Sequence, residues 1–406
     1  MNSAVPTLFT SPEECCGCGA CAARCPFQAI EMREDVFGFV YPHIDEEICM
    51  GCGLCKRVCG YQGEIPRRSS GPWYAASAGD GSPGSASGGA FAMLAQGILE
   101  NGGVVYGAAY ERMEDGLHVR HRRIQDLSEL VALQGSKYVQ SRLVDCFPEV
   151  EEDLKRGVPV LFSGTPCQIA GVKSYLKRDY ANLLTVDLIC HGVPNEVMFI
   201  GYVKMLERQA GSRIADMRFR DKARGWDAPL ALLSKYENGS TSLVPAGDSS
   251  YYDSFLHLKT LRDSCYSCPF AGKNRPADLT VGDYWGVQVQ TPELLSENGG
   301  PFEMRQGISC LLVNNRAGQN GLEKYGVALK LRSVDFGQIA AGNDQLRAPA
   351  VKPKDRKRYL LAFSRGGWPA VEREWRVRKF PSRIKSRAFA YVPRQVKDLV
   401  KKFLGR

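Results

Sequence analysis

Short apolar runs alternate with longer amphipathic segments between about residue 87 and residue 334. Short apolar runs predict buried strands, and apolar positions that recur every three or four residues predict helices. Strands are expected at 104–107, 158–162, 183–189, 216–220, 230–236, 279–281, 308–313 and 328–331. Helices are expected at 90–100 and 147–156, after Pro166, and at 195–209. The alternation predicts an α/β domain.

Two changes in composition divide the chain into three parts. Residues 67–87 are rich in Ser, Gly and Pro, which predicts a linker between an N-terminal module at 1–68 and the α/β domain at 72–345. The third part, 346–406, is basic, because residues 351–406 contain 18 Lys or Arg and 4 Asp or Glu, a charge of +14, against −5 for the rest. Apolar residues recur at helical spacing between its last lysines, so we expect a basic helical C-terminal tail.

This tail could dock on an anionic membrane surface or an acidic partner, and the simpler alternative is a solvated helix. No nucleic-acid motif accompanies the charge, so no nucleic acid is expected as a partner. No stretch approaches the roughly 20 apolar residues that span a bilayer, and no basic region followed by an apolar run begins the chain. We therefore expect a cytoplasmic protein, with peripheral membrane attachment as a further option. In the reducing cytoplasm, its 15 cysteines would be metal ligands or reduced thiols.

The N-terminal module carries two copies of one cysteine spacing, C-x2-C-x2-C-x3-C. The first run is Cys15, Cys18, Cys21 and Cys25, and the second run is Cys49, Cys52, Cys55 and Cys59. Three thiolates at this spacing can bind three corners of one [4Fe-4S] cluster, and the fourth ligand comes from elsewhere. Zinc sites usually combine two C-x2-C pairs instead. The duplicated run therefore predicts two clusters in a ferredoxin-like α+β module.

In two-cluster ferredoxins the last cysteine of each run ligates the other cluster. Carried over here, the first cluster takes Cys15, Cys18, Cys21 and Cys59, and the second takes Cys49, Cys52, Cys55 and Cys25. Pro26 follows Cys25 as this pattern expects, whereas Gly60 occupies the place of the second proline. Cys16 belongs to neither set, and we interpret it as a spare buried thiol.

Four later cysteines also have surroundings suited to a metal: Cys167, Cys190, Cys265 and Cys268. Cys167 follows Thr165 and Pro166 at a predicted helix start, where the helix dipole favours a thiolate. Cys190 ends a predicted strand, and α/β sheets bind ligands at the carboxyl edge of their strands. A third iron–sulfur cluster, a structural zinc ion and a nucleophilic Cys167 assisted by His191 are all compatible with these positions.

Six short strings follow one another along the α/β domain. They are Ser87-Gly88-Gly89-Ala90-Phe91, Gly103-Val104-Val105-Tyr106-Gly107-Ala108, Gly135-Ser136-Lys137-Tyr138, Gly164-Thr165-Pro166-Cys167-Gln168, Cys190-His191-Gly192-Val193-Pro194 and Gly282-Asp283-Tyr284-Trp285-Gly286. In this order they resemble the coenzyme F420 hydrogenase/dehydrogenase beta subunit family, over about residues 72 to 335. The resemblance implies a larger α/β flavin domain that holds FAD and its own iron–sulfur cluster, and so favours a third cluster at the four later cysteines.

The resemblance further implies an FAD and [4Fe-4S]-dependent oxidoreductase. Such an enzyme would move electrons between ferredoxin or another soluble carrier and an organic substrate or a deazaflavin-like coenzyme. Flavin suits this position because it exchanges single electrons with clusters and hydride with organic molecules. The alternative is a non-catalytic electron-relay subunit of a larger redox complex.

Candidate FAD contacts lie in these motifs. Ser87, Gly88 and Gly89 precede a predicted helix and could cradle phosphate, although no G-x-G-x-x-G follows a strand. Lys137 could neutralise phosphate or contact the flavin ring, and His191 could relay a proton, so both are candidate catalytic residues. The other expected contacts are Tyr138, Gly164, Thr165, Gln168, Asp283 and Trp285. A basic loop with Arg220, Lys222 and Arg224 could receive an anionic substrate or be a solvated loop.

Overall fold

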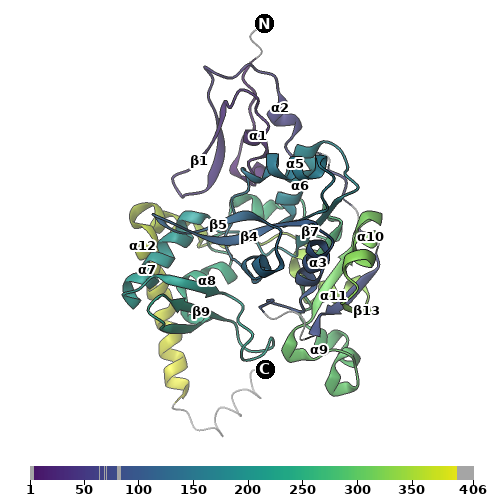
Figure 1. Cartoon of the computed structure of the whole chain (residues 1–406). Helices are drawn as coiled ribbons and strands as arrows, with labels where there is room; N and C mark the ends of the chain where they lie inside the picture. Colours follow the sequence, from purple (N-terminus) through teal and green to yellow (C-terminus); the bar gives the residue numbers. More distant parts are fainter. Residues whose placement is uncertain (1–3, 64, 68, 70, 80–83, 391–406) are drawn as a thin grey trace.

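The computed structural model describes residues 4–63, 65–67, 69, 71–79 and 84–390, with side chains described as far as Lys379. Residues 396–404, for which an amphipathic helix is expected, lie outside the described residues. The N-terminal module projects from one end of the molecule (Figure 1). Its elements are η1 (Pro12–Glu14), α1 (Ala20–Ala23), β1 (Ile30–Glu34), β2 (Val40–Ile44) and α2 (Leu54–Arg57). It contains both helices and strands, as predicted.

Both short helices of this module start directly after a glycine within a cysteine run. Gly19 and Gly53 precede α1 and α2 with φ angles of 83° and 68°. Residues with a Cβ rarely adopt this left-handed conformation, so glycine allows the chain to turn tightly between ligand cysteines. β1 and β2 pair antiparallel on the other side of the module and complete it.

An eight-stranded sheet forms the centre of the larger part, in the order β13-β3-β12-β11-β7-β6-β4-β5. The strands are β3 (Trp73–Ser77), β4 (Val104–Met113), β5 (Gly116–Ile124), β6 (Val160–Gly164), β7 (Leu183–Leu188), β11 (Leu279–Asp283), β12 (Ser309–Val313) and β13 (Lys330–Ser333). The neighbours β4, β6, β7 and β11 run parallel, and the other pairs are antiparallel. Every residue of β6 is buried, which is typical of a strand covered on both faces.

Helices cover both faces of this sheet. They are α3 (Ala90–Glu100), α4 (Leu130–Leu133), α5 (Cys146–Lys155), α6 (Pro166–Leu176), α9 (Val287–Gln290), α10 (Arg316–Tyr325) and α11 (Phe336–Ala341). Leu161 of β6 packs in one cluster with α3 and α10, whereas Val160 and Phe162 pack in another with α5 and α6. Successive strand residues face opposite sides of a sheet, so α3 and α10 lie on one face and α5 and α6 on the other.

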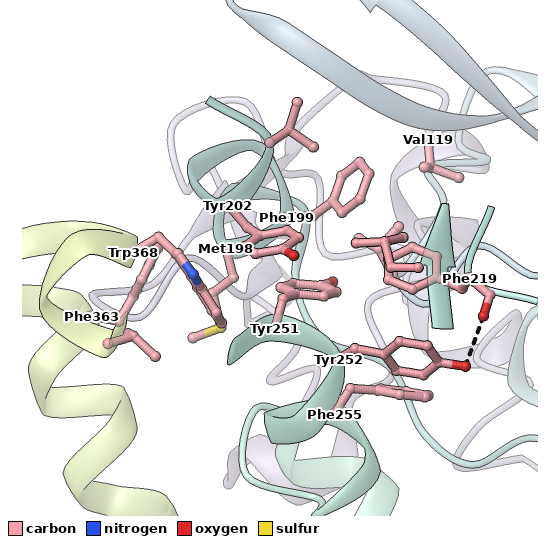
Figure 2. Close-up of a cluster of buried hydrophobic side chains, with 14 of the residues drawn as sticks. Val119, Met198, Phe199, Tyr202, Phe219, Tyr251, Tyr252, Phe255, Phe363 and Trp368 are labelled. Atoms are coloured by element: carbon pink, nitrogen blue, oxygen red, sulfur yellow. Dashed lines mark hydrogen bonds between the residues drawn. The ribbon is translucent and has the colours of Figure 1, made fainter. Parts of the chain in front are cut away.

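A smaller sheet, β10-β9-β8, packs beside the large one with three further helices. Its strands are β8 (Ile214–Arg218), β9 (Ala231–Tyr236) and β10 (Thr241–Pro245), and the helices are α7 (Glu196–Ala210), α8 (Ser250–Leu256) and α12 (Arg356–Ala390). Figure 2 shows their shared core, in which Tyr202 of α7, Tyr251 of α8 and Trp368 of α12 meet. The Tyr252 hydroxyl donates a hydrogen bond to the Phe219 carbonyl at 2.8 Å.

The sheet contains strands that the hydrophobic pattern does not predict. β3 lies inside the predicted linker 67–87 and pairs with both β12 and β13, so the linker prediction is wrong for residues 73–77. β5 was not predicted because charged and histidine residues, including Arg120, His121 and Arg122, interrupt its apolar positions. It is held instead by a nine-residue register against β4. Helix α3 has the predicted bounds.

The basic tail is in part an integral piece of the fold. Trp368 and Trp375 of α12 are 1% and 2% exposed, and their indole nitrogens donate to Ser250 and Asp253. Cations of this segment form ion pairs, such as Arg356 with Asp263 and Lys379 with Asp253. The described part of the segment is therefore neither a free tail nor a solvated helix. Among the described helices, none is both long enough and apolar enough to cross a membrane.

Candidate redox site

The first predicted ligand set surrounds one cavity. Cys15, Cys18, Cys21 and Cys59 all border a space of about 220 Å³. Burial raises the pKa of Cys21 well above its ordinary value, and the nearby thiols of Cys18, Cys15 and Cys59 raise it further. Cys59 therefore lies with the first run, although it belongs to the second run in sequence.

The second predicted set borders a smaller cavity near the far end of the module. Cys25, Cys49, Cys52 and Cys55 surround about 20 Å³. Cys55 borders both cavities, and Cys52 is exposed. The places of Cys25 and Cys59 agree with the crossed ligand pattern predicted from the two-cluster spacing.

The four later cysteines converge at the carboxyl edge of the large sheet. β6 and β7 are parallel neighbours, so Cys167, at the start of α6, and Cys190, just after β7, emerge on the same side. Cys265 lies in η5 (Asp263–Ser267), and Cys268 ends that turn. Burial raises the pKa of Cys190 well above its ordinary value, and the thiols of Cys265, Cys167 and Cys268 add to this rise. All four thiols therefore lie within electrostatic reach of one another.

Cys167 differs from its three neighbours in its acidity. A hydrogen bond from Cys16 lowers the pKa of Cys167 to about 7, and Thr165 and the positive charge of Arg262 act in the same direction. Burial raises the pKa of Cys265 to about 12 and that of Cys268 to about 11. Cys167 therefore has the lowest pKa of these four thiols. The main cause of the lowered pKa is the hydrogen bond from Cys16, whereas the sequence predicted an effect of the helix dipole.

Cys16 connects the first run with the later cysteines. Its side chain is 4% exposed and lies within hydrogen-bonding reach of the Cys167 and Cys18 thiols, and these contacts together with burial raise the pKa of Cys16 well above the ordinary value. From the sequence, Cys16 is interpreted as a spare thiol, because its position outside both ligand sets gives no sign of this contact. In space it lies between the first cavity and the later cysteine group.

The module and the larger part approach so closely that two glycines are required. A Cβ on Gly60 would lie 2.2 Å from the Ala170 carbonyl oxygen of α6, and one on Gly171 would lie 3.0 Å from the Cys18 sulfur. Gly60 is the residue that replaces the proline of the ferredoxin pattern. Its departure from the pattern is explained by packing, since a proline ring would collide with α6.

Two of the predicted FAD segments meet the basic loop, which was predicted to receive an anionic substrate or to be solvated. Lys222 donates to the Ser87 carbonyl oxygen and to that of Gln306, both at 2.7 Å. Asp283 forms an ion pair with Arg220 at 3.2 Å and accepts a hydrogen bond from Trp226. The structure therefore brings the loop before α3, the end of β11 and the basic loop into one group.

Aromatic rings complete this group. Trp285 stacks on Trp226 with ring centroids 5.0 Å apart, and the Arg220 guanidinium lies 4.6 Å from the Trp285 ring centroid. Tyr138 stacks on Phe255 at 4.4 Å, and Phe255 also lies 4.9 Å from the ring of His191. An aromatic path therefore leads from the residue after Cys190 toward the predicted flavin contacts. We call Ser87, Tyr138, Arg220, Lys222, Asp283 and Trp285 the ring-and-cation group.

Other predicted FAD contacts have different surroundings. Thr165 and Gln168 form a capping box at the start of α6, and Gln168 also donates to Ser141. The polar atoms of Gln168 are thus engaged in structure. A Cβ on Gly164 would lie 3.1 Å from the Gln168 oxygen, which makes Gly164 a packing residue. Gly88 packs in the same way, because its Cβ would lie 2.4 Å from the Ala76 carbonyl oxygen.

Lys137 adjoins Tyr138 in the chain, but its side chain contacts residues outside the ring-and-cation group. Its ammonium donates to the carbonyl oxygens of Ala132 and Gln134 at 2.9 and 2.8 Å, and it lies 5.6 Å from the Tyr110 ring centroid. Burial lowers the pKa of Lys137 to about 7, against the opposing influence of Asp216. His191 lies nearer the cysteines, and its buried Nε2 has no partner among the described residues.

Comparisons with known proteins bear on both parts of the chain. Residues 158–336 match the family described as the C terminus of the coenzyme F420 hydrogenase/dehydrogenase beta subunit. We call residues 158–336 the family segment. Residues 14–62 match the 4Fe-4S dicluster domain, which makes the N-terminal module an iron–sulfur module. Both parts of the predicted resemblance are confirmed.

Two further comparisons add little to the family matches. A chain from the F420-reducing [NiFe] hydrogenase complex of Methanosarcina barkeri is similar at 16% identity, with 77% of this chain and 93% of that chain covered and a TM-score of 0.44. No curated protein matches significantly.

The family segment contains the four later cysteines, and their donor chemistry suits a cluster. Thiolates are the usual ligands of [4Fe-4S] clusters, with one cysteine on each iron. Within the described part of the chain, no three His, Cys, Asp or Glu side chains stand close enough together to hold a single metal ion. A cluster places its ligands on separate irons, so its thiols need not meet at one point.

Sequence reasoning missed one further residue of this site. Arg262 is 1% exposed, donates to the Cys15 carbonyl oxygen at 2.9 Å and precedes Cys265 by three residues. No motif marks it, since an arginine before a C-x2-C pair is by pattern an ordinary surface cation. Its guanidinium contacts the N-terminal module at the Cys15 and Val40 carbonyl oxygens, so docking of that module on the family segment contributes to its burial.

Proposed function

We propose that this chain is an FAD and [4Fe-4S]-dependent oxidoreductase with three clusters. Electrons from ferredoxin or another soluble carrier would enter at the second cysteine run, pass to the first run and then to a cluster held by Cys167, Cys190, Cys265 and Cys268. The observation that carries this proposal is the convergence of those four thiols beside the first cavity, with Cys16 between the two groups. The confirmed iron–sulfur module and family segment support the same class of reaction.

Bound FAD would supply the conversion between single-electron and hydride transfer. The ring-and-cation group offers what such a ligand needs: cations for phosphate and flat aromatic side chains for a ring system. Arg220 and Lys222 would hold the charged portion, and Trp285 would pack against a ring. His191 has an unpartnered buried nitrogen among the described residues and could hold a proton beside the substrate, which we take to be an organic molecule or a deazaflavin-like coenzyme.

The donor is proposed to dock at the second run. Phe27, Ile48 and Met50 are 46%, 48% and 61% exposed there, and Cys52 is exposed as well. Exposed apolar side chains around a redox centre suit a brief encounter with a small carrier.

Anaerobic purification and metal analysis test the proposal. Three clusters and one flavin predict about twelve irons and one FAD per chain. Zinc together with about eight irons would rule out the third cluster. The flavin of the reduced protein should then be reoxidised by candidate acceptors, coenzyme F420 included.

The same experiment separates the second candidate function, a non-catalytic relay subunit. A relay would accept electrons from dithionite but be reoxidised by none of the organic acceptors. The close docking of the module on the larger part supports both candidate functions equally, because each requires electrons to pass between the two parts.

A further inference from the structure

Four arginines are buried in the described part of the chain, and one of them has an unusual environment. Arg220, Arg275 and Arg356 each form an ion pair with a carboxylate, at 3.2, 3.1 and 3.0 Å. Arg262, although only 1% exposed, forms no ion pair among the described residues. Its guanidinium donates to neutral oxygens only, those of Cys15, Val40 and Gln140. A buried cation without an opposite charge is strongly unfavourable.

Both cysteine-bearing segments contact Arg262. Its guanidinium donates to the Cys15 carbonyl oxygen of the first set at 2.9 Å, and its own carbonyl oxygen accepts a hydrogen bond from the Cys265 backbone N–H of the later set at 3.0 Å. A Cβ on Gly17 would lie 2.8 Å from the guanidinium carbon, so the cysteine loop passes directly over it. The rings of Tyr41 and Phe39 lie 4.3 and 5.8 Å away and exclude water from the remaining side.

We propose that Arg262 is the shared counter-cation of the first and third clusters, and that it sets their reduction potentials. Clusters ligated by four thiolates are anionic, so each supplies the opposite charge that no carboxylate provides. A cation beside a cluster favours the added electron and raises its potential. Arg262 is thus a positioning and tuning residue, and this inference rests on the proposed three-cluster function.

Gln140 fixes this arrangement. Its side chain donates to the Cys16 carbonyl oxygen at 2.8 Å and accepts from Arg262 at 3.3 Å. The same amide therefore connects the guanidinium to the loop that carries the first run. Cys15 and Gly17, which lie against Arg262, border the first cavity but not the second, so the second cluster should not respond to Arg262.

The test measures the three cluster potentials by anaerobic redox titration with electron paramagnetic resonance. In Arg262→Met, which removes the charge, the reduction equilibria of the first and third clusters should each fall at least tenfold, equivalent to about 59 mV for one electron. The second cluster should keep its potential. Arg262→Lys, which retains the charge, should keep all three close to wild type. Unchanged potentials in Arg262→Met, with iron content intact, would overturn the proposal.

Arg112→Met is the matched control, because Arg112 is partly buried but paired with Glu207. It should shift no potential, and an equal shift there would also overturn the proposal. If Arg262→Met binds no iron, Arg262→Lys decides: recovery of the iron supports a role of charge, and no recovery contradicts it. The iron and zinc contents of the wild-type protein test the proposed function separately. If the later cysteines hold zinc, the reduction potential of the first cluster still tests the role of Arg262.

Discussion

The two cysteine runs share one spacing but have very different surroundings. The first run packs against α6, contacts Cys16 and Arg262, and borders the larger cavity. The second run lies near the far end of the module, with Cys52 and several apolar side chains exposed. Identical ligand spacing therefore does not make equivalent sites. We infer that the second run exchanges electrons with outside carriers and that the first run passes them inward.

The largest expected effect comes from replacing the last cysteine of each run, which is predicted to ligate the cluster of the other run. Cys25→Ser should remove the second cluster and Cys59→Ser the first, each with a loss of about four irons per chain. The reason is that each cysteine borders the cavity of the opposite run. Iron analysis and the cluster spectra of the two variants show which cluster each variant has lost.

Cys146→Ala is the control for these variants, because Cys146 is buried and donates to the His121 carbonyl oxygen away from both cavities. It should retain all iron. If Cys25→Ser removed the first cluster instead, the ligands would not cross and the comparison of the runs would fail.

The next largest effect concerns the lability of the two clusters. Exposed thiolates react more readily with oxidants, so ferricyanide with a chelator should remove the second cluster roughly tenfold faster than the first. Iron release followed over time should show a fast phase of about four irons. Release of all iron in a single phase would contradict the difference in exposure.

A smaller effect is expected from restoring the proline of the ferredoxin pattern. Gly60→Pro should destabilise the protein by about 1–3 kcal/mol, because any Cβ there collides with the Ala170 carbonyl oxygen. Chemical unfolding measures this change, and hydrogen exchange in α6 should increase. The matched position in the first run, Pro26, is exposed, so Pro26→Ala should change stability little. A stable Gly60→Pro variant would mean that the module does not dock closely.

The smallest effect is expected from Lys352, which pairs with Glu13 at 3.4 Å and Asp263 at 2.7 Å. Lys352 and Glu13 are both more than one-third exposed, so Lys352→Met should cost less than about 1 kcal/mol. The free energy of unfolding of this variant is compared with that of Lys354→Met, because Lys354 is an exposed lysine two residues away. A loss of several kcal/mol in Lys352→Met alone would show that this contact holds the module in place.

The sequence predicts the parts of the molecule that depend on local patterns. The helix at 90–100, the parallel strands and the convergence of Cys167 with Cys190 follow from periodicity and from the edge rule for α/β sheets. β3 and β5 were missed because long-range pairing, not local hydrophobicity, holds them in the sheet.

The missed site residues share one physical reason. Cys16, Gly60 and Arg262 acquire their surroundings only when the module docks on α6 and η5. Thr165 and Gln168 remain predicted FAD contacts, and the structure adds that their polar atoms also form a local capping box. Sequence motifs identify which residue types are present, whereas the docking of the N-terminal module on the larger part determines which of those residues contact one another.

Gly60 also limits how this protein could be built or altered. A ferredoxin domain taken from elsewhere, with the usual proline after its last ligand, would bind its clusters but dock less tightly on α6. A grafted ferredoxin domain should therefore need glycine at this one position before it can pack closely enough on α6 to exchange electrons with the rest of the protein.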